Sequence, residues 1–173
     1  MKKILQKAMA GFLVMVVACN GSATKSADES TKTDSTMSNE NTMAATSDAI
    51  IKATFPLKSD QEVPANNSSG SGTADVTYNK DSKMLTYTLN FNGLTGKATM
   101  AHIHGTAPKG TNAGVKHDLT SVLPKETSGS FTDSVKIDAS DIKEDSLLSG
   151  FYYFNIHTPA NPGGEIRGQI ELK

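Results

Sequence analysis

The 173-residue sequence contains no tryptophan, one cysteine (Cys19) and one arginine (Arg167). With a single cysteine, no disulfide can form within the chain, so the fold has to be stabilised by its core. The sequence also has no marked excess of charge of either sign, since it contains 17 basic and 18 acidic residues. A nucleic-acid-binding domain would carry a basic stripe, so we expect no nucleic-acid partner.

The first 18 residues have the pattern of a signal peptide. Lys2, Lys3 and Lys7 form a basic start, and the apolar run 8–18 that follows is too short to span a bilayer as a helix. We therefore predict that residues 1–18 are a targeting segment and no part of the fold. Their removal would leave 17 − 3 = 14 basic residues against 18 acidic ones, a net charge of −4.

Cys19 stands directly after this apolar run. The residues Val16-Val17-Ala18-Cys19 resemble the bacterial lipobox, in which the cysteine is lipidated and becomes the first residue of the mature chain. Several acyl chains on one residue anchor a protein stably. The resemblance implies a lipoprotein of the bacterial cell envelope, anchored to a membrane and extracytoplasmic. The alternative is an ordinary buried thiol.

The chain then divides into a linker and one domain. Residues 20–49 consist almost wholly of small, polar and charged residues and contain no aromatic side chain. Such a segment cannot bury enough surface to offset the loss of chain entropy on folding. We therefore expect residues 19–49 to be the lipidated cysteine and a disordered linker. Residues 50–173 have the length of one domain.

Residues 50–173 have the pattern of an all-β domain. Short segments rich in β-branched and aromatic residues are separated by turn residues. In residues 84–91, apolar and polar side chains alternate, which is typical of a strand with one core face and one solvent face. A count of seven or eight strands favours a Greek-key-like antiparallel β-sandwich, and a short helix is possible within 138–148. The strands are predicted at 50–57, 73–79, 84–91, 97–104, 130–137, 151–157 and 165–172.

All four histidines, His102, His104, His117 and His157, lie in this domain. Alternation along a strand places His102 and His104 on one face, roughly 6.6 Å apart. Alternation also places His157 and Arg167 on the polar sides of their strands. We therefore expect these side chains to share the outer surface of the sheet.

Histidines in this arrangement can bind a metal ion. Neutral imidazole is a ligand for copper and zinc, and three or four nitrogen ligands suit copper better than calcium or magnesium. The predicted ligands are His102, His104 and His157, with His117 as a fourth ligand on a loop. In the alternative interpretation, His102 and His104 hydrogen-bond to loop carbonyls and to Asn155, and so hold the following loop over the end of the sheet.

Six short blocks, in this order, resemble the CHRD domain, which is named after chordin and is also found in secreted bacterial proteins. The resemblance covers about residues 53–172. It implies a binding module with a possible extracytoplasmic protein partner, and no general activity is assigned to such domains. The blocks are Glu62-Val63-Pro64, Gly70 to Thr73, Leu85-Thr86-Tyr87, Ala101-His102-Ile103-His104-Gly105, Tyr153 to Thr158 and Gly164-Glu165-Ile166-Arg167-Gly168.

A weaker similarity is to copper/zinc superoxide dismutase, a Greek-key β-sandwich. Its copper ligands would match His102 and His104, His117 in a loop and His157 in a late strand. Arg167 would match the arginine that helps to guide the anion, although it could instead pair with a nearby carboxylate. The zinc-loop residues and the disulfide cysteines have no counterpart. The similarity therefore implies at most a copper-only, dismutase-like enzyme, as the alternative to the binding module.

Overall fold

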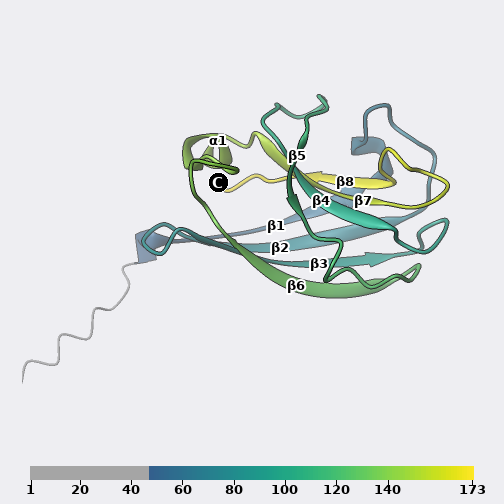
Figure 1. Cartoon of the computed structure of the whole chain (residues 1–173), viewed down its shortest axis with the longest axis horizontal. Helices are drawn as coiled ribbons and strands as arrows, with labels where there is room; N and C mark the ends of the chain where they lie inside the picture. The colour runs from purple at the N-terminus through teal and green to yellow at the C-terminus, as the bar shows by residue number, and fades with distance from the viewer. Residues whose placement is uncertain (1–46) are drawn as a thin grey trace, which may run out of the picture. The chain divides into compact units, whose positions relative to one another are not determined.

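The computed structural model describes residues 47–173 (Figure 1). The predicted signal peptide, the predicted lipidation site Cys19 and nearly all of the predicted linker lie outside the described residues. Within residues 47–173, no helix is both long enough and apolar enough to cross a membrane.

The described chain forms one antiparallel sheet of eight strands, in the order β5-β4-β7-β8-β1-β2-β3-β6. The sheet curls, so that the half containing β4, β7 and β8 lies over the half containing β1, β2, β3 and β6 (Figure 1). The predicted all-β fold is confirmed. The elements are η1 Ser47–Ala49, β1 Ile50–Lys58, η2 Ser59–Gln61, β2 Ser71–Asn79, β3 Met84–Asn92, β4 Met100–Gly105, β5 Val115–Asp118, β6 Gly129–Lys136, α1 Glu144–Leu148, β7 Tyr152–His157 and β8 Ile166–Gln169.

The core lies between the two halves of the curled sheet. Phe154 of β7 is fully buried. Its ring centroid lies 5.0 Å from that of Tyr87 on β3 and 6.2 Å from that of Phe55 on β1. Burying a side chain of this size stabilises a fold by about 1.5–3 kcal/mol. Contacts of this kind therefore hold the two halves together.

Every predicted strand overlaps an observed one, and the differences are local. The segment predicted as a strand over 97–104 begins at Met100, and the helix considered within 138–148 is confined to Glu144–Leu148. β5 was not predicted, because this edge strand is short and mostly exposed, and Val115 at its start is 51% exposed. An edge strand of this kind lacks the apolar alternation that identifies the others.

Candidate metal centre

A buried polar layer lies on the non-core side of β4, β7 and β8. The core-facing side chains of β7 include Phe154 and Ile156, as alternation predicts, but the opposite side chains are buried as well. The histidines and the polar side of the last strand share one side of the sheet, as predicted, but the prediction that this side is the outer surface is wrong, because it is buried. The loop at 106–114 bonds to this face and covers it. The buried polar residues are His104, Tyr153, Asn155, His157, Arg167 and Gln169.

Three histidines meet in this layer. His102, His104 and His157 each offer one imidazole nitrogen, and these three nitrogens lie within 4.8 Å of one another. His102 Nδ1 and His157 Nε2 are 3.0 Å apart. Nitrogens that bind one ion at about 2.0–2.1 Å lie about 3–4 Å apart. Small rotations of the rings would therefore let all three share an ion.

The second nitrogen of each ring faces an oxygen acceptor. His104 Nδ1 lies 2.8 Å from the Ala113 carbonyl, and His157 Nδ1 lies 3.0 Å from the Pro162 carbonyl. A carbonyl can only accept, so both Nδ1 atoms carry the proton and both Nε2 atoms keep a lone pair, which on His157 accepts a hydrogen bond from His102 Nδ1. His102 Nε2 lies 3.8 Å from a carboxylate oxygen of Asp118. Metal-binding histidines usually have such partners on their second nitrogen.

The inner side of the cluster holds acceptors that lack donors. His104 Nε2 and Asn155 Oδ1 are both buried, and neither has a hydrogen-bond partner within the described part of the chain. A buried acceptor without a partner costs about 1–3 kcal/mol. The bond from His104 to Ala113 agrees with the interpretation in which the histidines only hold the loop. Against the larger effect of burial, a side-chain hydrogen bond with Asn155 raises the pKa of His104 and also agrees with that interpretation, whereas a cation would give the neutral His104 ring a partner at Nε2.

Burial keeps the three rings neutral at physiological pH. It is the main cause that lowers the pKa of each of His102, His104 and His157. The pKa of His157 falls to about 4, since burial outweighs the opposing Pro162 carbonyl and the two neighbouring imidazoles lower the value further. Neutral imidazole is the form that binds a metal ion.

Arg167 packs on Tyr153, which also contacts His104. Its guanidinium carbon lies 3.4 Å from the ring centroid of Tyr153, and the ring of His104 stacks on the same tyrosine at 4.9 Å. Because β7 lies between β4 and β8, the tyrosine separates the arginine from the histidine. Arg167 also donates to the Thr111 carbonyl at 2.9 Å and to Asn112 Oδ1 at 3.1 Å.

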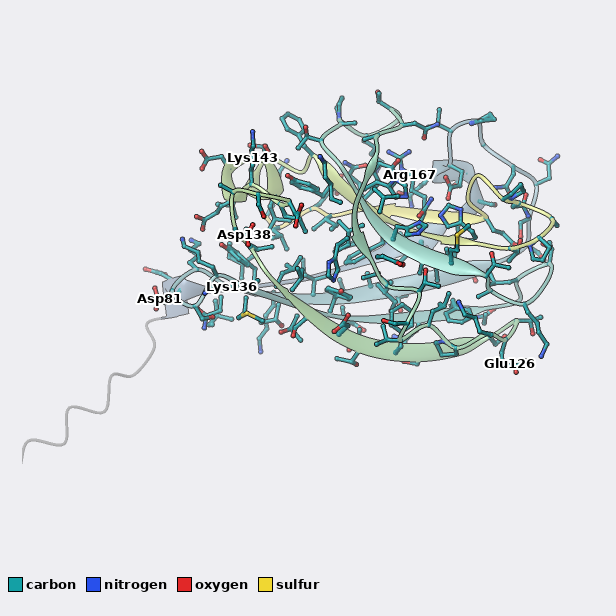
Figure 2. The ribbon with its side chains drawn as sticks, in the orientation of Figure 1. Asp81, Glu126, Lys136, Asp138, Lys143 and Arg167 are labelled. Carbon is teal, nitrogen blue, oxygen red and sulfur yellow. The ribbon has the colours of Figure 1, made fainter. Side chains whose placement is uncertain are left out.

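Arg167, on β8, therefore holds the covering loop in place. It is 1% exposed and lies within the outline of the domain, whereas Asp81 and Glu126 project from its ends (Figure 2). This burial does not suit the role of guiding an anion from solvent, which the similarity to the dismutase implied.

Glu62 lies near Arg167 and is 6% exposed. Its Oε1 atom has no hydrogen-bond partner among residues 47–173. Burial raises its pKa to about 7, against the attraction of Arg167. Its carboxylate packs on Gly164, where a Cβ atom would collide with it and where the φ angle of +131° favours glycine.

The fourth predicted ligand, His117, does not join the cluster of three. It lies on β5, where it pairs with Ile103, and paired residues share one face of a sheet. His117 therefore faces away from the side of His102 and His104. Asp118 pairs with His102 instead and comes within reach of its ring.

Sequence reasoning placed Asn155 beside the histidines and missed two other residues near the site. Asn155 shares the parity of His157, and it is the partner of the histidines that the alternative interpretation named. Asp118 could be placed only once β5 was known to pair with β4. Glu62 lies in the segment that follows β1, and no periodic signal connects this segment to the site.

The comparisons with known proteins agree with the resemblance noted in the sequence. The family model of the CHRD domain matches residues 53–170, which is more than half of the chain. No curated protein and no solved structure shows significant similarity to the chain. The similarity to superoxide dismutase therefore has no support from these comparisons. The chain belongs to the CHRD domain family.

Proposed function

We propose that this protein is a binding module that takes up a transition-metal ion through His102, His104 and His157. The observation that carries the proposal is the geometry of the three rings. One nitrogen of each lies within 4.8 Å of the other two, and the second nitrogen faces Asp118 or a backbone carbonyl. Imidazole ligands favour copper or zinc over calcium or magnesium.

The surrounding residues prepare the site for an ion. The carbonyls of Ala113 and Pro162 hold two rings in the tautomer that directs Nε2 inward. Stacking on Tyr153 limits rotation of His104. A bound copper ion would supply one-electron chemistry, whereas zinc would supply Lewis acidity. The burial of Arg167 favours binding over a dismutase-like activity, since that activity would need a cation exposed to the anion.

The proposal includes a location at the cell envelope. Its support is the lipobox-like sequence Val16-Val17-Ala18-Cys19 after a basic and apolar start. An anchored CHRD domain would present its metal site outside the cytoplasm, where it would also meet any extracytoplasmic protein partner. Expression of the wild-type protein and of Cys19→Ser in bacteria with a labelled fatty acid tests the anchor. We expect label on the wild-type protein alone, and an unlabelled wild-type protein would contradict the anchor.

Titration of the purified full chain with Zn(II) and with Cu(II) tests the metal site. We expect one ion per chain. His104→Gln should weaken binding by about tenfold or more, because it removes an inward nitrogen. His117→Gln is the matched control and should bind like the wild-type protein, and circular dichroism should show both variants folded. The proposal fails if the wild-type protein binds neither ion, or if both variants weaken binding equally.

A further inference from the structure

Met100 lies beside the histidine cluster on the same face of the sheet. It is the first residue of β4, and it pairs with His157 of β7. Directly paired residues of antiparallel strands have Cβ atoms about 4.5–5.5 Å apart on one face. Alternation along β4 also places Met100 on the side of His102. The thioether therefore belongs to the same local group as two of the three imidazoles.

The exposed fractions of these side chains show which of them lie nearest to solvent. Met100 is 39% exposed, although most large apolar side chains of the domain are buried, and the His102 side chain is 12% exposed. His104 and His157 lie deeper, at 9% and 5%. Met100 therefore stands at the solvent side of the cluster. A methionine side chain has three rotatable bonds, so its sulfur can turn towards a neighbouring ion.

We propose that Met100 supplies a thioether ligand to the histidine site and that the site prefers the cuprous ion. This inference rests on the proposed metal-binding function. Thioether sulfur is a soft ligand that selects Cu(I), whereas imidazole alone also suits Zn(II) and Cu(II). A set of three imidazoles and one thioether therefore favours copper in its lower oxidation state.

The charges around the cluster support the same choice. The three imidazoles and the thioether are uncharged ligands, and the nearby carboxylate of Asp118 faces the outer nitrogen of His102. On the other side, the buried cation of Arg167 lies behind Tyr153. This cation disfavours added positive charge at the end of the site where His104 stacks on the same tyrosine. A buried site of this kind holds one positive charge at lower cost than two.

The position of Met100 also indicates how an ion enters. His102 and Met100 are the more exposed members of the group, and the other two rings lie deeper. A cuprous ion arriving from solvent or from another protein would meet the thioether first. The site would therefore exchange Cu(I) through this sulfur.

Metal affinities of the full chain and of two leucine variants test the inference. Met100→Leu keeps the size and apolar character of the side chain and removes the sulfur. Met84→Leu is the matched control, because Met84 also begins a strand but lies on β3, where it pairs with Asn79 and Lys136. Cu(I) affinity is measured anaerobically against a chromophoric Cu(I) chelator, and Zn(II) affinity is measured by titration.

We expect Met100→Leu to weaken Cu(I) binding by about tenfold or more and to leave Zn(II) binding within about twofold of the wild-type value. Met84→Leu should change neither. X-ray absorption of the Cu(I) complex should show a sulfur neighbour in the wild-type protein and in Met84→Leu, and none in Met100→Leu.

The outcomes separate this inference from the proposed function. If Cu(I) binds through the histidines with no sulfur neighbour, and Met100→Leu binds it as tightly as the wild-type protein, the role of Met100 is refuted and the histidine site stands. Equal weakening of Cu(I) and Zn(II) in Met100→Leu would likewise refute it, because the residue would then act through packing. If the wild-type protein binds neither Cu(I) nor Zn(II), the proposed function itself fails.

Discussion

Replacing Glu62 with glutamine should remove a pH-dependent loss of stability that the wild-type protein shows between about pH 4.5 and pH 7. The carboxyl group is 6% exposed, and burial raises its pKa from 4.5 to about 7 despite the attraction of Arg167. Glutamine keeps the shape of the protonated carboxyl group and cannot ionise. The difference in unfolding free energy between the two proteins therefore isolates this one titration.

The direction of this change in stability with pH follows from proton binding. Because folding raises the pKa of Glu62, the folded protein keeps this proton at a pH where the unfolded chain has lost it. Its contribution to stability is fully present below the unfolded value of 4.5 and is lost as the pH rises through about 7. At about 1.4 kcal/mol per pH unit, the wild-type protein should lose about 3 kcal/mol relative to Glu62→Gln across this interval.

Urea unfolding followed by circular dichroism, at closely spaced pH values from 4 to 8, measures the difference. The buried histidines titrate in the opposite sense, because folding lowers the pKa of His157 to about 4 and its contribution is lost as the pH falls. Both proteins contain these histidines, so their effect cancels in the difference. The reasoning would be refuted if the difference in unfolding free energy between the two proteins stayed constant, or if the wild-type protein became relatively more stable as the pH rises.

Three further predictions concern the core, the glycine beside Glu62 and proton competition at the metal site. Phe154→Ala should lower the unfolding free energy by about 3–5 kcal/mol, because it leaves a cavity between the two halves of the sheet, whereas Phe151→Ala at a position that is 40% exposed should cost less than about 1 kcal/mol; equal costs in urea unfolding would contradict the two-layer core. Gly164→Ala should destabilise the protein by about 1–3 kcal/mol more than Gly163→Ala does, because only at Gly164 would a Cβ atom collide with the carboxylate, and its φ angle is positive; similar unfolding midpoints for the two variants would be evidence against this packing. Because burial lowers the pKa of His157 and of its two neighbours, Zn(II) affinity should fall by less than about fivefold from pH 7.5 to pH 6. Three unperturbed imidazoles would lose about 50-fold in affinity over this interval, and a measured loss near that value would show that the rings are exposed to water.

The strands show which parts of the fold could be predicted. The alternation over residues 84–91 is a local property, and β3 forms there with Leu85, Tyr87 and Leu89 buried. β5 has no such pattern, and its pairing with β4 depends on residues more than ten positions away in the chain. The prediction therefore succeeded where one face of a strand meets the core, and it failed at an edge strand.

The histidines show the same division. The shared face of His102 and His104 follows from the period of a strand, and these two rings do meet His157. His117 could not be placed without the register of β5, which turns it to the other face. The prediction of an exposed site was wrong because alternation distinguishes two faces but does not say whether a loop covers the second one.

The sequence by itself determined the all-β class, the parity of each long strand and membership of the CHRD family, because period-two alternation and short motifs are local. Only the tertiary structure decided that the polar side of β7 is buried, that Arg167 is enclosed behind Tyr153, and that Met100 stands beside His157. These facts depend on strand order, register and a loop that returns over the sheet. They arise from contacts between distant segments, which no local pattern specifies.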